Sequence, residues 1–143
     1  MPSSTLQAGL RHRFTYTVPL ERTVPHLYPD SPEMAVMPEV FATGFMVGLI
    51  EWTCVQLINP HLDWPREMTV GTHIDVSHEA ATPPGMAVTV EVELLAVEGR
   101  RLRFAVRADD EVDRIASGTH ERSVIDAARF GARIAEKAGR DRA

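Results

Sequence analysis

Glu51 is the first residue whose type and surroundings indicate chemistry, because it is a lone carboxylate inside an apolar helical run. None of its neighbours one turn away on that helix carries a charge. Burying an ionised carboxylate without a partner is costly, so Glu51 must reach a polar cavity, a hydrogen-bonding partner or a proton. A carboxylate held in this way can act as a general base or a nucleophile. The alternative is a structural role, in which Glu51 faces solvent or fixes a contact between subunits.

Two further side chains are expected on the same side of the molecule. His78 ends an alternating row over residues 70–78 whose even-numbered members should cover the helix, which makes it the natural partner of Glu51. Thr43 precedes Glu51 by eight residues, a little over two helical turns, so the two share a broad face. Taken alone, His78 can be a structural histidine, and Thr43 can bond its own backbone. Together the three predict an acid–histidine–hydroxyl site without defining its substrate.

Gly71 begins the strand that carries His78, on the face opposite to the even-numbered row. A glycine there lets a backbone N–H approach a ligand closely, or simply marks a bulge. The other histidines offer less, since they lack an obvious partner: His12, His26, His61, His73 and His120. No histidine pair has the spacing of metal ligands with a cysteine or carboxylate nearby, so no metal site is predicted. Nucleophile-elbow, phosphate-loop and dinucleotide motifs are not found either.

The composition is that of one folded domain, which we expect to span residues 1–143. The net charge is −5 and the basic residues form no patch before the C-terminal tail, which disfavours nucleic acid as a ligand. A single cysteine, Cys54, excludes an intrachain disulfide and favours the cytoplasm. Residues 1–10 show no signal-peptide pattern, and Glu51 interrupts the best candidate membrane span, residues 40–58. We therefore expect no membrane partner.

The elements that must position these residues begin with a strand over residues 13–18, ended by Pro19. Residues 19–39 contain too many prolines for a long helix or central strand, so they are predicted to form a lid or binding segment, or else a poorly ordered connector. Pro38 then opens the helix predicted over residues 39–58, whose apolar residues surround it almost completely. That distribution is typical of a helix buried in the core.

From Thr69 onward the hydrophobic period changes to two. A turn is predicted at residues 81–85, and a meander of about four strands leads to a polar amphipathic helix over residues 126–137. Two inward rows follow that turn: Val88, Val90, Val92 and Leu94, then Leu102, Phe104, Val106 and Ala108. One antiparallel sheet must cover one apolar helix, and wrapping the sheet around it is the economical solution. The sequence therefore predicts an α+β protein with the hot-dog fold.

Five segments carry a more specific resemblance, which covers nearly the whole chain. They resemble the fluoroacetyl-CoA thioesterases, which are homodimeric hot-dog enzymes: HLYPDSPE (26–33), PEVFATGFMVGLIEWTCV (38–55), SHEAATPPG (77–85), VEGRR (97–101) and SGTHERSVI (117–125). The resemblance implies a homodimer that hydrolyses a short-chain acyl-CoA, with coenzyme A as part of the substrate and no separate cofactor. If the substrate is fluoroacetyl-CoA, it also implies a role in detoxification.

The resemblance also implies roles for individual residues. The Thr, Glu and His of the family fall on Thr43, Glu51 and His78, and a glycine near the acyl group falls on Gly71. The proline-rich lid departs from the family, because Met34 and Met37 stand where the family has phenylalanines that close over the acyl group. Methionine is flexible and lacks an aromatic face, so the chemistry should survive, whereas selectivity for a fluorinated acyl group depends on these two positions.

Two other functions stay open at this point. A hot-dog hydratase acting on enoyl-CoA also pairs an acid with a histidine, although no motif here places Asp and His on one loop after the helix. A non-catalytic acyl-CoA-binding dimer would bind CoA esters tightly and turn none of them over.

Overall fold

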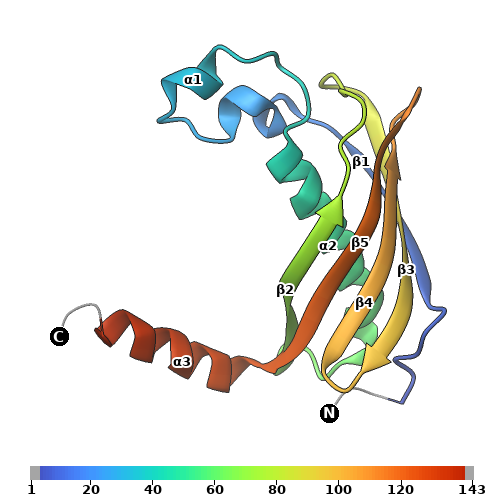
Figure 1. Cartoon of the computed structure of the whole chain (residues 1–143), viewed down its shortest axis with the longest axis vertical. Coiled ribbons are helices and arrows are strands. Elements are labelled where there is room, and N and C mark those ends of the chain that lie inside the picture. Colours follow the sequence, from blue (N-terminus) through green and yellow to red (C-terminus); the bar gives the residue numbers. More distant parts are fainter. Residues whose placement is uncertain (1–3, 141–143) are drawn as a thin grey trace.

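A curved antiparallel sheet holds one long helix, α2 (Thr43–Ile58), against its concave face (Figure 1). The computed structural model describes residues 4–140. The strands stand in the order β1-β3-β4-β5-β2, with bounds β1 (Arg11–Thr17), β2 (Glu67–Val76), β3 (Ala87–Glu98), β4 (Arg101–Asp109) and β5 (Arg114–Asp126). The remaining helices are α1 (Pro32–Ala35), α3 (Ala127–Arg140) and the short 3-10 turns η1 (Leu20–Arg22), η2 (Val24–His26) and η3 (Asn59–His61). The predicted α+β arrangement is confirmed.

The core lies between α2 and the middle of the sheet. Both predicted inward rows, residues 88–94 on β3 and 102–108 on β4, are buried at every second position. They meet the buried face of α2, which includes Met46, Ile50 and Ile58. A strand that alternates in this way can cover a helix on one side only, and this places α2 firmly on one face of the sheet.

The start of the central helix differs from the prediction. α2 begins at Thr43 rather than at residue 39, and Pro38 does not open it. The residues in between are used by other segments, because Phe41 donates its N–H to the carbonyl of Thr82 and Ala42 donates its N–H to the carbonyl of Arg22. Those hydrogen bonds hold residues 41 and 42 in an extended conformation, so α2 begins only after them.

The connection after β2 is not the predicted local turn. β2 pairs with β5 and not with β3, so residues 77–86 cross the end of the sheet from one edge to the other. Backbone hydrogen bonds mark the route, first to β5 through Ser77 and Glu79, and then to the chain after β1 through Val18. Only β3, β4 and β5 form a meander. This crossing leaves β2 as an edge strand.

A bulge in β2 reverses the predicted alternation in its first half. Gly71 pairs with Arg122 and His73 pairs with Glu121, so Thr72 is an extra residue between the two pairs. Partners in an antiparallel ladder point to the same face, which turns Gly71 toward α2 and not away from it as predicted. His73 faces outward, as expected.

The proline-rich segment and the last helix both lie outside the main body (Figure 1). Residues 19–39 fold into η1, η2 and α1 beyond the N-terminal end of α2, and a methyl group added at Gly44 would lie 3.2 Å from Cδ1 of Leu27. α3 follows β5 directly and extends away from the sheet. Within residues 4–140, no helix is both long and apolar enough to cross a membrane.

Candidate functional site

The partner of Glu51 is Arg122, on β5. Nη1 of Arg122 donates to Oε1 of Glu51 at 2.9 Å, and the Arg122 side chain is 7% exposed against 39% for Glu51. The guanidinium is held from behind by Thr69, whose Oγ1 accepts from Nε at 2.8 Å and whose carbonyl accepts from Nη2 at 3.0 Å. Of the three outcomes expected for Glu51, a cavity, a partner or a proton, the structure shows a hydrogen-bonding partner from elsewhere in the chain and a pocket beside the carboxylate. Within one chain, Arg122 and not the expected His78 holds this position.

Gly71 makes room for the Glu51 carboxylate. A Cβ atom at position 71 would lie 2.5 Å from Oε1 of Glu51, closer than non-bonded atoms approach, and at a tight 3.3 Å from Nη1 of Arg122. The bulge turns this glycine inward, so the backbone of β2 comes directly against the carboxylate. Both interpretations of this glycine, as the mark of a bulge and as a site of close backbone approach, are therefore correct.

His120 completes this cluster, and the prediction that it lacks a partner is wrong. Its Nε2 lies 3.1 Å from Nη1 of Arg122, and its Nδ1 lies 2.7 Å from the carbonyl oxygen of His73. The imidazole is 2% exposed and stacks on Phe104. Burial is the largest effect on its pKa, which lies below the ordinary value. The signal was available in the sequence, since His120 and Arg122 share the inward face of the last strand.

Thr43 and His78 form a second pair at the N-terminal end of α2. Oγ1 of Thr43 and Nδ1 of His78 are hydrogen-bonded at 2.7 Å, with His78 just beyond the end of β2. Burial lowers the pKa of His78, against a smaller opposing effect of the Ala80 backbone. Within residues 4–140, no hydrogen bond of regular geometry reaches its buried Nε2.

The two pairs are separate within one chain. Thr43 and Glu51 are eight residues apart on α2, which corresponds to about 12 Å along the helix axis. A pocket of about 410 Å³ opens beside Glu51 and is lined by Val47, Glu51, Gly71, Thr72, His73, Ile74 and His120. Met34 and Met37 lie in the proline-rich segment and do not line this pocket, and Met37 is 48% exposed.

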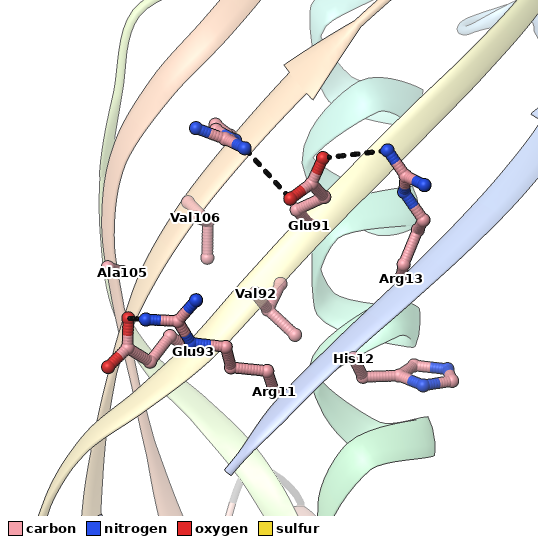
Figure 2. A pocket seen from close by; sticks show the side chains of 9 residues that line it. Arg11, His12, Arg13, Glu91, Val92, Glu93, Ala105 and Val106 are labelled. Atoms are coloured by element: carbon pink, nitrogen blue, oxygen red, sulfur yellow. Dashed lines mark hydrogen bonds and ion pairs between the residues drawn. The ribbon is translucent and has the colours of Figure 1, made fainter. Parts of the chain in front are cut away.

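A larger hollow lies on the opposite, outer face of the sheet and is chemically different (Figure 2). Its volume is about 750 Å³, and it runs across β1, β3 and β4. The charges around it are already paired, because Glu91 bridges Arg13 and Arg107 while Arg11 contacts Glu93. Exposed pairs of this kind contribute little and leave no reactive group, so we assign the functional site to the pocket beside Glu51.

Cys54 lies one helical turn after Glu51 and is a buried free thiol. Burial raises its pKa to about 12, so the reactive thiolate form is almost unpopulated at neutral pH. Cys54 is therefore a core residue and not a nucleophile. Within the described part of the chain, no three His, Cys, Asp or Glu side chains gather so as to hold a metal ion.

Comparison with known proteins places the chain among its relatives. The model of the fluoroacetyl-CoA-specific thioesterase family matches residues 22–128. A fluoroacetyl-CoA thioesterase from Streptantibioticus cattleyicolor is 55% identical over 132 residues, covering 92% of this chain and 94% of that protein. The chain belongs to the fluoroacetyl-CoA-specific thioesterase family.

Solved structures agree with this family membership. The fluoroacetyl-CoA-specific thioesterase, as a phenylalanine-to-alanine variant in complex with fluoroacetate and CoA, is 57% identical with a TM-score of 0.85, and the match covers 87% of this chain and 99% of that one. A hot-dog-like protein from Thermanaerovibrio acidaminovorans, 24% identical, has a TM-score of 0.76 over 91% of each chain. The predicted hot-dog fold and the predicted resemblance to the fluoroacetyl-CoA thioesterases are both confirmed.

Proposed function

We propose that this protein hydrolyses a short-chain acyl-CoA thioester, with fluoroacetyl-CoA as the first candidate, to the free acid and CoA. The observation that carries the proposal is the Glu51 carboxylate, which Arg122 holds at the mouth of a pocket beside a glycine backbone. A reaction at a carbonyl needs an activated oxygen and a donor for the developing oxyanion. Glu51 supplies the first, and the backbone N–H of Gly71 is the candidate for the second.

In the reaction, an oxygen nucleophile bonds to the acyl carbon, the C–S bond breaks, and CoA leaves with the electron pair. A thiolate is a good leaving group, so acid assistance matters less than in amide cleavage. We assign Glu51 as the base that takes a proton from water, or as the nucleophile of an acyl-Glu51 intermediate. His78 polarises the thioester or shuttles the proton, and Thr43 positions it through their 2.7 Å hydrogen bond.

The two routes for Glu51 differ in a covalent intermediate. Rapid acid quenching followed by peptide mass spectrometry should find the acyl mass on the peptide that contains Glu51 if the residue is a nucleophile. A quenched protein without this mass, during turnover, supports the general-base route.

The decisive test of the function is replacement of Glu51 by glutamine, which keeps an oxygen to accept from Arg122 and removes the charge. We expect thiol release to fall by about 10²–10⁴-fold while the melting temperature changes little. Glu98→Gln, at the exposed end of β3, is the matched control. Retained turnover in the Glu51→Gln protein would remove the assignment.

We further propose that the protein is a homodimer whose active site uses residues of both chains. β2 is an edge strand with residues 71–75 exposed, and the pocket beside Glu51 opens at this edge. An exposed edge pairs readily with a second copy. A two-fold axis perpendicular to β2 would pair the two edge strands antiparallel and bring the Thr43–His78 pair of one chain toward the Glu51 of the other.

Mixing two inactive variants tests this arrangement. If the site is shared, a heterodimer of Glu51→Gln and His78→Asn chains keeps one complete site, so an equal mixture should recover about a quarter of full activity. If each site lies within one chain, every site in the heterodimer lacks one residue and the mixture stays inactive. Equal mixtures with unchanged chains serve as the reference.

The substrate is expected to be selected by the proline-rich segment, through Met34 and Met37. Coenzyme A is part of the substrate, and no further cofactor is proposed. The buried, reduced Cys54 suits a reducing compartment, so we place the activity in the cytoplasm, where hydrolysis of fluoroacetyl-CoA would serve detoxification.

A thiol-release panel with fluoroacetyl-, acetyl-, propionyl- and longer acyl-CoA esters defines the acyl group. It also separates the other two functions. Loss of ultraviolet absorbance from an enoyl thioester without free thiol would favour a hydratase. Tight binding of every ester without turnover would favour a binding protein.

A further inference from the structure

His120 lies between the two structures that shape the pocket, the Arg122 guanidinium and the bulge of β2. Its Nε2 faces Nη1 of Arg122 at 3.1 Å, and its Nδ1 faces the carbonyl of His73 at 2.7 Å. His73 is the residue with which regular pairing resumes after the bulge. One buried side chain therefore contacts both parts of the site that meet at Glu51.

These two contacts permit only one protonation state of the ring. The Arg122 nitrogen can only donate, so Nε2 of His120 must be the acceptor. The His73 carbonyl can only accept, so Nδ1 must carry the proton. An imidazolium would place an N–H at Nε2 against an N–H of Arg122, beside a fixed positive charge.

The surroundings support the same state. The groups that face the ring are the Arg122 cation on its own strand, Phe104 on β4, the His73 carbonyl on β2 and the Glu51 carboxylate on α2, while Glu121, the next residue along β5, acts from the opposite face. The ring is 2% exposed, so water offers little compensation for a charge. Burial, as the largest effect, lowers its pKa.

The Arg122 guanidinium is fixed by this arrangement. Thr69 binds its Nε and Nη2 from one side, and His120 accepts one of the two hydrogens on Nη1. The second Nη1 hydrogen is then directed at Oε1 of Glu51. Without an acceptor at position 120, one Nη1 hydrogen of Arg122 would be buried without a partner. Alternatively, the guanidinium would rotate and weaken its hydrogen bond to Glu51.

We propose that His120 is a positioning residue of the thioesterase site, which acts as a fixed Nδ1–H imidazole that orients Arg122 toward Glu51 and anchors the β2 bulge at His73. It contributes to the lining of the pocket, and its effect on the reaction is exerted through Arg122 and not on the reacting atoms. The proposal rests on the thioesterase function given above. Its effect should appear in kcat more than in KM, because it sets the geometry of the carboxylate and not the binding of CoA.

Two substitutions separate the two contacts. The amide of glutamine reaches the position of Nε2, so His120→Gln keeps an acceptor for Arg122. The amide of asparagine reaches the position of Nδ1, so His120→Asn keeps the donor to the His73 carbonyl and leaves Arg122 without its acceptor. His61→Gln and His61→Asn are the matched controls, since His61 lies in η3 and bonds Thr5, away from the site.

We expect His120→Asn to lower kcat by about tenfold or more with a smaller change in KM, and His120→Gln to retain most of kcat. Hydrogen exchange at the bulge should instead rise in His120→Gln more than in His120→Asn. Equal kcat losses in both variants, or wild-type kcat in both, would overturn the positioning role. Circular dichroism and melting temperature identify a variant that is merely unfolded.

A spectroscopic measurement tests the tautomer without relying on activity. In the ¹⁵N-labelled protein, the imidazole signals that disappear in His120→Gln should show a protonated Nδ1 and an unprotonated Nε2 from about pH 8 to pH 5. A His120 ring that titrates near 6.5 or carries its proton on Nε2 overturns the proposal. If the unchanged protein releases no thiol from any ester, the thioesterase function fails, while this measurement still decides the state of His120.

Discussion

Oε1 of Glu51 occupies the space that a side chain at Gly71 would need, with only 2.5 Å between that oxygen and the position of a Cβ atom. The helix and the edge strand thus meet at a carboxylate and a bare backbone. A thioester bound in the adjacent pocket would meet the carboxylate and the Gly71 backbone next to each other. The absence of a side chain at position 71 is therefore part of the site, although glycine contributes no functional group beyond its backbone.

Gly71→Ala should lower activity more than stability. The added methyl group collides with the end of a flexible side chain, so the fold can adjust by moving the Glu51 carboxylate. A displacement of about 1 Å costs roughly 10²-fold in rate, and we expect a loss of that order in kcat/KM. Gly48→Ala is the control, since a methyl group there meets nothing within 4 Å among the described residues. A Gly71→Ala enzyme with normal kcat/KM would contradict the close approach.

Arg122→Lys should lower kcat although it preserves the charge. Lysine cannot reproduce the fork that binds Thr69, His120 and Glu51 together, so the carboxylate loses its fixed orientation. We expect a decrease of about tenfold or more, measured by thiol release at saturating substrate. Arg103→Lys, on the exposed side of β4, is the matched control. Equal kcat in both variants would show that charge alone is needed.

Stability should fall as the pH is lowered through the histidine range. Burial lowers the pKa values of His78 and His120 below 6.5 in the folded protein. Below that pH the unfolded chain takes up protons that the folded chain does not, so the free energy of unfolding decreases, and the loss levels off below the folded-state values.

Urea midpoints at pH 7.5, 6.5 and 5.5 measure this loss. The carboxylates with lowered pKa, such as Glu91 and Asp110, lose their contribution only as the pH falls below about 4.5, so the two effects separate. His120→Gln should flatten the slope between pH 6.5 and 5.5. A constant midpoint over this range in the unchanged protein would contradict neutral, buried histidines.

The double substitution Met34→Phe and Met37→Phe should sharpen the preference for fluoroacetyl-CoA over acetyl-CoA. Rigid aromatic rings would close over a small acyl group better than flexible thioethers, and we expect the ratio of kcat/KM values to rise by up to about tenfold. Val36→Phe, at a position that is 84% exposed, controls for added aromatic surface. An unchanged ratio would place selectivity outside the proline-rich segment.

Much of the fold follows from local patterns. Alternation on β3 and β4 and the apolar surface of α2 specify the core, because each inward residue must be covered by another element. The path of residues 77–86 and the start of α2 at Thr43 were missed for a common reason. Both depend on backbone hydrogen bonds between distant segments, such as that from Phe41 to Thr82, and no local pattern encodes them.

The sequence identified individual residues of the site, but it did not show which of them contact each other. A carboxylate in an apolar helix singled out Glu51, which has a partner but is also 39% exposed at a pocket, and the helical period placed Thr43 on the same helix. The inward orientation of Gly71 was missed because one inserted residue, Thr72, reverses the strand parity in the first half of β2. Arg122 also pairs with Glu51 from a strand 71 residues away, which local spacing cannot reveal.

Cys54 can be used to measure how often the core of the protein opens. The thiol is fully buried one turn from Glu51 and has a pKa of about 12, so a thiol reagent reaches it only when the core opens. The slow rate of its labelling, compared with that of the unfolded chain, converts into the free energy of that opening. A bound acyl group or CoA that closes the pocket would slow the labelling further. The labelling rate of Cys54 would then report ligand binding, although this residue takes no part in catalysis.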